Sequence, residues 1–247
     1  MTVIAPATPT APTAPAATTT RAIRLAALGG ARAMLPWLAG VVPFGLTVGV
    51  TIAESAVDPL AGWATGPLVY AGSAQLAAIE LLDGGASMAV VVITILVINA
   101  RLLVYSGSMA PWWTGSGRGF RALAAYLLID PSYAVGTDGY RTHATRREAH
   151  AHYLGCGVTL WMAWQAAIGI GILAGGAVPD MSLLSLVVPY YLVAEVIRST
   201  DSRPAGAAAA VGAVIAIAAN GVPMHAGAVI AIAAGVAAAG LVEERMS

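Results

Sequence analysis

Long stretches with almost no charged residues constrain the fold of this chain more than any other feature. A helix rises ~1.5 Å per residue, so about 20 apolar residues are needed to cross the hydrocarbon core of a bilayer. The stretches lack the alternation of polar and apolar residues that marks barrel strands, so we predict an all-α, polytopic helical membrane protein. The predicted spans fall in residues 33–53, 59–79, 84–108, 121–140, 153–179, 181–197 and 204–242.

The last stretch is too long for one span. Residues 204–242 are 39 residues without charge, which as one helix would measure ~58 Å, about twice the hydrocarbon thickness. We therefore predict two spans, with a turn at residues 220–223, which read Asn-Gly-Val-Pro. The chain then has about eight transmembrane helices, or seven if Asp130-Pro131 disqualifies the fourth stretch.

The arginines predict the orientation of these eight spans, because cytoplasmic loops carry an excess of basic residues. With the N-terminus inside, only Arg118 and Arg121 fall in outer segments. Trp112 and Trp113 then end the third span on the outer side, where an aromatic belt is typical. We predict that both termini are cytoplasmic and that the protein is a multi-pass protein of the plasma membrane. The inner arginines are Arg21, Arg24, Arg32, Arg141, Arg146, Arg147, Arg198, Arg203 and Arg245.

The composition excludes several classes of protein. Charged residues make up 10% of the chain, whereas a soluble domain has about a quarter. The formal net charge is zero, which argues against nucleic-acid binding. A single cysteine, Cys156, excludes a disulfide framework and a cysteine-based metal cluster, and we expect no cofactor. Residues 1–20 are nearly all Ala, Thr and Pro, so we predict a disordered tail before one transmembrane domain over residues 21–247.

Two charged residues remain inside the membrane on this map. Arg101 lies ~22 Å along the third span and Asp130 interrupts the fourth. A charge at the centre of a membrane helix costs ~2.5–3.5 kcal/mol, so each needs a partner or a role. Three interpretations of Arg101 stay open: it snorkels to the surface, it forms a fixed ion pair with Asp130, or it contacts a substrate directly.

Polar side chains accompany both charges at helical spacing. Tyr105 follows Arg101 by four residues and Ser108 by seven, so these three share a helix face. Tyr133 and Thr137 similarly share a face with Asp130. Pro131 predicts a break in the fourth span, which is tolerated in a membrane where it lines a polar cavity, and Asp130 there is suited to hold a cation or relay a proton.

The second predicted span holds another polar group, Tyr-Ala-Gly-Ser-Ala-Gln at residues 70–75. Tyr70 and Ser73 lie on one stripe at helical spacing, and Gly-Pro at residues 66–67 and Gly72 are places where the helix can unwind. The glycines and Ser73 also fit close helix packing, whereas Gln75 is poorly compatible with lipid and is interpreted as functional. The candidate substrate-binding residues are Tyr70, Ser73, Gln75, Asn99, Arg101 and Tyr105, and the candidate for ion or proton coupling is Asp130.

The histidines carry little functional signal. His143, His150 and His152 fall among arginines in a predicted inner loop, without the spacing of a zinc motif. We predict that this loop is solvated and binds no metal. His225 lies next to the predicted outer turn, where it either senses pH or simply occupies the interface.

Two segments carry a more specific pattern. Residues 69–75 read Val-Tyr-Ala-Gly-Ser-Ala-Gln, and residues 99–111 contain Asn-Ala-Arg, then Tyr, Ser and Pro. These segments resemble the V-[FY]-A-G-A-S-Q and N-x-R-H-x-x-Y-x-x-S-x-x-P signatures of the AzlC family, the large subunits of branched-chain amino acid exporters. Pro-Phe-Gly at residues 43–45 and Val-Pro at 222–223 fit the same family, so that the similarity covers about residues 25–242.

The chain departs from this family at three places. Ala and Ser are exchanged at residues 73–74, Leu102 replaces the usual His, and residues 129–133 keep the Asp of T-D-E-x-F but not its Glu. The resemblance implies a transporter rather than an enzyme, efflux of Leu, Ile, Val or Met, and a small AzlD-like partner subunit. The departures leave a different substrate or coupling ion open.

The residues themselves fit a zwitterionic solute. Arg101 with Gln75 supplies donors for a carboxylate, Asp130 supplies an acceptor for an ammonium group, and apolar walls suit an aliphatic side chain. Three alternatives stay open: export of another small polar solute, a structural subunit in which Arg101 and Asp130 only pair, and an intramembrane serine hydrolase. The hydrolase would use Ser73 or Ser108 with His225, but neither serine lies in a G-x-S-G context.

Overall fold

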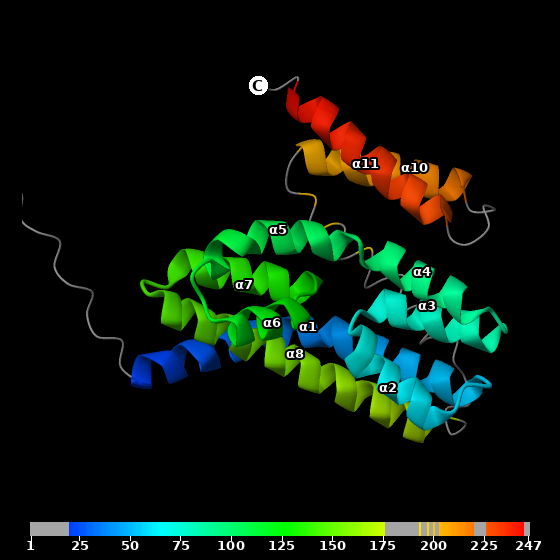
Figure 1. The fold of residues 1–247 in the computed structure, drawn as a ribbon, viewed down its shortest axis with the longest axis horizontal. Helices are drawn as coiled ribbons and strands as arrows, with labels where there is room; N and C mark the ends of the chain where they lie inside the picture. Colours follow the sequence, from blue (N-terminus) through cyan, green and yellow to red (C-terminus); the bar gives the residue numbers. More distant parts are fainter. Residues whose placement is uncertain are drawn as a thin grey trace, which may run out of the picture.

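The computed structural model describes residues 20–175, 193, 197, 200, 203–219 and 226–244. Every element in these residues is an α-helix, as predicted (Figure 1). The predicted tail before Thr20, most of the predicted span at 181–197, the turn at 220–223 and His225 lie outside the described residues. The helices are α1 (Thr20–Glu54), α2 (Pro59–Val69), α3 (Gly72–Asp83), α4 (Met88–Asn99), α5 (Arg101–Trp113), α6 (Arg118–Tyr126), α7 (Asp130–Thr142), α8 (Arg146–Ala174), α10 (Arg203–Ala218) and α11 (Ala226–Glu244).

Two long helices form the centre of the bundle. α1 and α8 are each long and apolar enough to cross a membrane. They lie side by side and run in the same direction, because the early turns of α1 contact the early turns of α8 and the late turns contact the late turns (Figure 1). Phe44, Leu160 and Trp164 belong to the core that these helices share. The helices predicted at residues 33–53 and from residue 153 are therefore confirmed.

Glycines allow the backbones of α1 and α8 to touch. A Cβ atom on Gly30 would overlap the backbone of α8, and one on Gly155 would overlap the backbone of α1. Gly49 and Gly171 face each other near the far ends of the two helices. Small residues at close helix contacts are typical of membrane bundles, where packing rather than water drives association.

The chain next doubles back in a helical hairpin. α2 and α3 are broken at Tyr70-Ala71, and with 11 and 12 residues neither is long enough to cross a ~30 Å core. α2 begins where α1 ends, and α3 returns to the same place, where the backbone N–H of Ala56 donates to the Asp83 carboxylate (2.7 Å). The prediction of a single span at residues 59–79 is wrong, because the tip of this hairpin lies inside the bundle.

α4 and α5 lead away from that end as one bent unit. The two helices meet at Ala100 with a bend of 45°, and together they are long and apolar enough for one span. The indole of Trp113, the last residue of α5, donates to the hydroxyl of Tyr140 in α7 (3.0 Å). This contact lies beside the start of α8. The predicted span at residues 84–108 is therefore present as a broken helix that ends five residues later.

α6 and α7 form a second hairpin, which enters the bundle from the opposite end to the first. α6 begins beside the start of α8, where the Ser116 hydroxyl lies 2.8 Å from Nε2 of His150. α7 runs back to the same region, where Tyr140 also lies 2.8 Å from Nδ1 of His150. The prediction of a crossing helix at residues 121–140 is wrong, because the tip of this second hairpin also lies inside the bundle.

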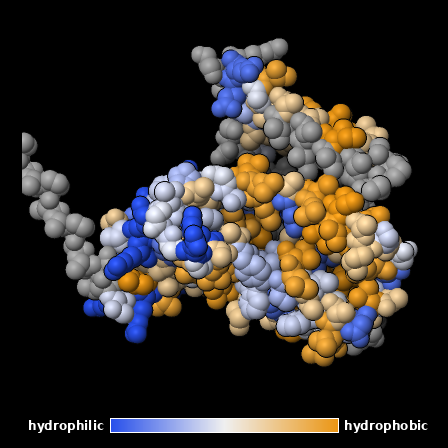
Figure 2. Space-filling view, in the orientation of Figure 1, coloured by the Kyte–Doolittle hydropathy of each residue, from blue (hydrophilic) through white to orange (hydrophobic). Residues whose placement is uncertain are grey.

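Most of the described arginines lie at one end of the bundle, and a group of acidic residues lies at the other end. We call the end where α1 and α8 begin the arginine end, and the end where α1 finishes the acidic end. Hydrophilic residues gather where α1 begins, while apolar side chains cover much of the remaining face (Figure 2). The arginine end carries Arg21, Arg24, Arg118, Arg121, Arg141, Arg146 and Arg147 together with Asp138 and Glu148, and the acidic end carries Glu54, Asp58, Glu80 and Asp83.

This separation corrects the predicted arrangement of the loops. Arg118, Arg121 and the Trp112-Trp113 pair, predicted on the outer side, share an end with the predicted inner loop around Arg146, whose Nη1 donates to the Thr114 carbonyl (2.9 Å). The length of an uncharged run does not distinguish a helix that crosses from a helical hairpin that returns. Two described helices qualify as spans, or three if the α4–α5 pair counts as one, so the eight predicted spans are not confirmed.

The last two described helices pack against each other. Gly235 of α11 lies against Ala208 of α10, and Gly212 of α10 lies against Ala231 of α11, so they are antiparallel. The long stretch at residues 204–242 thus contains two helices, as predicted. α11 also contacts α4 (Figure 1).

The histidine region is helical and packed rather than a solvated loop. His143 follows α7 directly, and His150 and His152 lie in the first turns of α8. The His150 ring stacks on Phe120 at 3.9 Å between ring centroids, and Nδ1 of His152 lies 3.2 Å from Nε2 of His143. The prediction of a solvated loop is therefore wrong, and these rings hold the second hairpin against α8.

Candidate functional site

The tip of the first hairpin is shaped by local backbone geometry. Tyr70 adopts a left-handed conformation with φ of 38°, and its N–H donates to the Gly66 carbonyl, which ends α2. Ala71 is extended, and α3 begins at Gly72. The predicted unwinding near residues 66–72 is confirmed, but Tyr70 does not continue the helical stripe of Ser73, because no helix connects them.

The tip of the second hairpin forms where Pro131 was predicted to break the helix. Ile129 is extended, and α7 begins at Asp130 with the proline in its first turn, where a missing N–H costs nothing. The Ser132 hydroxyl accepts from the Ile129 N–H (2.9 Å) and lies 2.6 Å from the Leu127 carbonyl oxygen. Ser132 is fully buried, so this one side chain fixes the turn that presents Asp130.

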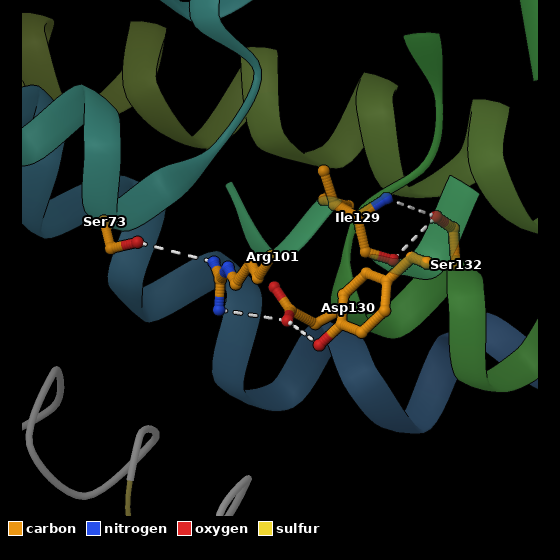
Figure 3. A network of polar contacts seen from close by, with 6 residues as sticks. Ser73, Arg101, Ile129, Asp130 and Ser132 are labelled. Carbon is orange, nitrogen blue, oxygen red and sulfur yellow. Dashed lines mark hydrogen bonds and ion pairs between the residues drawn. The ribbon is translucent and has the colours of Figure 1, made fainter. Parts of the chain in front are cut away.

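The two tips meet at Arg101, beside the bend between α4 and α5. Arg101 Nη1 lies 3.0 Å from Asp130 Oδ1, and Nη2 lies 3.5 Å from the Ser73 hydroxyl. Figure 3 shows the guanidinium between these two partners. Tyr105 donates a hydrogen bond to the same Asp130 oxygen (2.9 Å). The predicted Arg101–Asp130 pair is therefore present, with side-chain exposures of 36% and 18%.

A cavity of about 60 Å³ lies beside this pair. Its polar side is formed by Tyr70, Ser73, Arg101 and Asp130, and its apolar side comes from α1, α8 and Ile129. The volume is enough for roughly five water molecules. The apolar lining includes Val41, Phe44, Leu160 and Trp164.

Two residues of the cavity carry buried polar atoms without described partners. Tyr70, which lines the cavity, is 3% exposed, and its hydroxyl is buried with no hydrogen-bond partner among the described residues. Nε of Arg101 is also buried without a partner there. Leaving such groups unpaired costs ~1–3 kcal/mol each, so a bound polar solute would stabilise this site.

The polar faces predicted on α5 and α7 are confirmed, and they face each other. Tyr105 and Tyr133 stack with ring centroids 4.5 Å apart, and the Ser108 hydroxyl lies 3.1 Å from the Tyr133 hydroxyl. The Thr137 hydroxyl lies 3.7 Å from the Met109 sulfur. A seam of polar and aromatic side chains therefore runs from Asp130 toward the arginine end.

Three predicted substrate-binding residues do not line the cavity. One of them, Tyr105, contacts Asp130, which does, and its contact with substrate stays a prediction. The Gln75 amide donates to Thr65 (2.9 Å) and accepts from the Trp164 indole (3.0 Å), and its side chain is fully buried. Asn99 ends α4 and does not line the cavity, although its Oδ1 is buried without a described partner. Substrate contact by either residue stays a prediction, and for Gln75 the contacts favour support of Trp164.

Sequence reasoning missed the aromatic wall. Phe44 and Trp164 pack edge to face at 5.4 Å, and a Cβ on Gly72 would come within 2.8 Å of the Phe44 ring. Tyr126 stacks on Tyr70 at 5.5 Å and donates to the Pro67 carbonyl (2.8 Å), which joins the two hairpin tips. The only sequence signal was a set of hydrogen-bonding aromatic residues inside apolar stretches.

The hydrolase alternative depends on His225, which lies outside the described residues, so only the contacts of its two serines can be given. Ser73 contacts Arg101 and Ser108 contacts Tyr133, so neither is seen against a histidine in the described residues. No group of three or more His, Cys, Asp or Glu side chains in the part of the chain that the structure describes is placed to hold a metal ion.

Residues 36–178 match the family model described as AzlC protein, which is more than half of the chain. The chain belongs to the AzlC family. The match runs from the apolar part of α1 through both hairpins to the end of α8, so it contains every residue of the cavity. AzlC membership and the apolar helices identify a membrane protein with a transport-related function. No curated protein and no solved structure matches the chain.

Proposed function

We propose that this AzlC protein is a secondary transporter subunit that exports branched-chain or other apolar amino acids (Leu, Ile, Val, Met) across the plasma membrane, coupled to an ion or a proton. The observation that carries the proposal is the Arg101–Asp130 pair beside a cavity with an apolar aromatic wall. A charged pair deep in a membrane bundle is costly and typically marks a substrate or ion pathway.

The cavity offers a complementary group for each part of an amino acid. The Arg101 guanidinium and the Ser73 hydroxyl are donors for the carboxylate, and Asp130 accepts from the ammonium group. α3 and α7 both begin at the cavity, and the positive ends of their dipoles add to the attraction for a carboxylate. Phe44 and Trp164 contact the aliphatic side chain.

Binding requires the hairpin tips to move. A leucine molecule is larger than the roughly five waters that the cavity holds. The substrate therefore inserts between Arg101 and Asp130, exchanging their ion pair for two substrate contacts. Protonation of Asp130 would weaken its hold on the ammonium group and release it, which is the role in coupling that we assign to this residue.

The two hairpins suit alternating access. They enter from opposite ends and meet at the site. The α1 to α3 segment consists of a long helix followed by a hairpin, and the α4 to α7 segment consists of the bent α4–α5 unit followed by a hairpin. The two segments have opposite orientations in the bundle. Inverted repeats with broken helices at mid-membrane are characteristic of secondary transporters. We place α1, the α4–α5 pair and α8 across the membrane with the arginine end in the cytoplasm.

This arrangement predicts which positions a membrane-impermeant maleimide reaches in intact cells. In a Cys156→Ala background, Ser87→Cys at the acidic end is expected to react from outside, because it is exposed in the loop before α4. Gly119→Cys and Arg147→Cys are expected to react only in inside-out vesicles. The eight-span arrangement instead places residue 119 outside and residue 87 inside, so the opposite labelling pattern would disprove the hairpins.

The transport function is tested by feeding amino acids as dipeptides. Cells that express this protein with its small AzlD-like partner, the second subunit that we propose, are expected to accumulate several-fold less free leucine or methionine than cells without both. Charged amino acids such as lysine serve as the control, because the apolar wall does not suit them. Equal accumulation of every amino acid with and without the protein pair would contradict the proposal.

A further inference from the structure

A second and larger cavity lies at the arginine end, outside the site described above. Its volume is about 240 Å³, and it opens between the end of α5, the end of α7 and the start of α8. We call it the arginine-end cavity. Its lining includes Trp112, Tyr140, His143, Thr145 and Arg146.

The charge of this cavity is positive. Arg146 is its one arginine, and no Asp or Glu is among the residues that line it. Arg146 takes part in no ion pair within the described residues, and its Nη1 is held by the Thr114 carbonyl at 2.9 Å. Arg146 is an exposed residue, so the other N–H groups of its guanidinium are accessible to a ligand, and they favour an anionic oxygen.

The cavity connects to the Arg101–Asp130 site through the seam between α5 and α7. Trp112 stacks on Tyr140 (5.4 Å between centroids) at the cavity, and Ser108 pairs with Tyr133 one turn further in. Tyr105 then stacks on Tyr133 and donates to Asp130. Hydroxyl and aromatic groups on successive turns therefore link the two cavities.

We propose that the arginine-end cavity is a second binding site for the carboxylate of the amino acid substrate, occupied before the substrate moves along the α5–α7 seam to Arg101. This inference rests on the proposed function. Arg146 holds the carboxylate, and the rings of Trp112 and Tyr140 contact the aliphatic part. The site is weaker than the central one, because no carboxylate lines it to accept from the ammonium group.

The test is equilibrium binding of radiolabelled leucine to the purified protein, with Arg147→Gln as the matched control. Arg147 is exposed next to Arg146, carries the same charge and does not line the cavity. The wild type is expected to show a tight and a weak class of sites. Arg146→Gln should raise the dissociation constant of the weak class by about tenfold or more, as expected for loss of a charged hydrogen bond. Arg147→Gln should leave both classes unchanged.

Transport from the arginine end gives an independent readout. In vesicles that expose this end, Arg146→Gln should raise the half-saturating leucine concentration about tenfold with an unchanged maximal rate, because saturation restores occupancy of the cavity. Arg101→Gln should abolish the tight class of binding and keep the weak one.

The outcomes separate this inference from the proposed function. A single class of leucine sites that Arg101→Gln removes and Arg146→Gln leaves intact would overturn the second site and support the central one. Loss of co-purified anionic lipid in Arg146→Gln with unchanged leucine binding would assign the cavity to a lipid phosphate and overturn our inference. Absence of amino acid binding in the wild type would overturn both proposals.

Discussion

Replacing Arg101 with glutamine is expected to reduce amino acid export by at least about 100-fold. The change removes the donor for the substrate carboxylate and takes away the ion-pair partner of Asp130, a carboxylate that is 18% exposed and lies 3.0 Å from Arg101 Nη1. Truncating one partner of a hydrogen-bonded charge pair costs ~2–5 kcal/mol, and because Arg101 is 36% exposed we take ~3 kcal/mol, which corresponds to somewhat more than a hundredfold. Asp130→Asn is expected to lose export to a similar degree, because the ammonium group then loses its charged acceptor. The measurement is the rate of leucine or methionine efflux from preloaded cells.

Two controls distinguish a transport defect from a folding defect. Arg118→Gln makes the same chemical change at an exposed arginine of the arginine end and should keep full export. The double variant Arg101→Gln with Asp130→Asn leaves no uncompensated charge, so it should fold normally, as judged by its melting temperature, and still fail to export. Exchanging the two charges with Arg101→Asp and Asp130→Arg should also fail. Recovery of export in the exchanged variant would show that the two residues only pair with each other.

The helical fold was predictable from the sequence, whereas the path of the chain through the membrane was not. Long uncharged runs predict apolar helices, and α1 and α8 occupy two of those runs. Hydropathy does not show whether the chain continues forward or turns back, however. A helical hairpin of about 20 residues that turns at Tyr70 or before Asp130 therefore has the same hydropathy as a single crossing helix. The arginine count then separated Arg118 from Arg146, although both lie at the same end of the bundle.

The polar part of the site was more predictable than its apolar part. Arg101 and Asp130 stood out because charge is costly in lipid, and helical spacing correctly placed Tyr105 on the side that faces Asp130. Phe44 and Trp164 gave no such signal, because an aromatic residue in an apolar run is equally compatible with lipid and with a cavity wall. Gln75 also stood out, because an amide is costly in lipid, but the sequence did not show what it contacts. In the structure it accepts a hydrogen bond from the indole of Trp164.

Replacing a single glycine of the α1–α8 contact with alanine is expected to destabilise the whole protein. A Cβ atom on Gly155 would overlap the carbonyl oxygen, the carbonyl carbon and the Cα of Ala27. These backbone atoms cannot rotate away as a side chain can. The two helices must separate, which breaks the close packing on which association in a membrane depends. Gly155→Ala and Gly30→Ala should each lose about 3 kcal/mol of folding free energy, at the upper end of the usual cost of overpacking. The melting temperature of the purified protein should fall by roughly 10 °C.

Gly107→Ala is the matched control for this contact. Gly107 lies inside α5, and a Cβ placed there has no other atom within 4 Å. Alanine is the better helix former by ~1 kcal/mol, so this variant should melt at the wild-type temperature or slightly above it. Because both changes add the same methyl group to a helical glycine, the difference between them isolates the contact between α1 and α8. Equal melting temperatures for Gly107→Ala and Gly155→Ala would show that α1 and α8 do not touch through their backbones, and the position of both hairpins against them would then have to be revised.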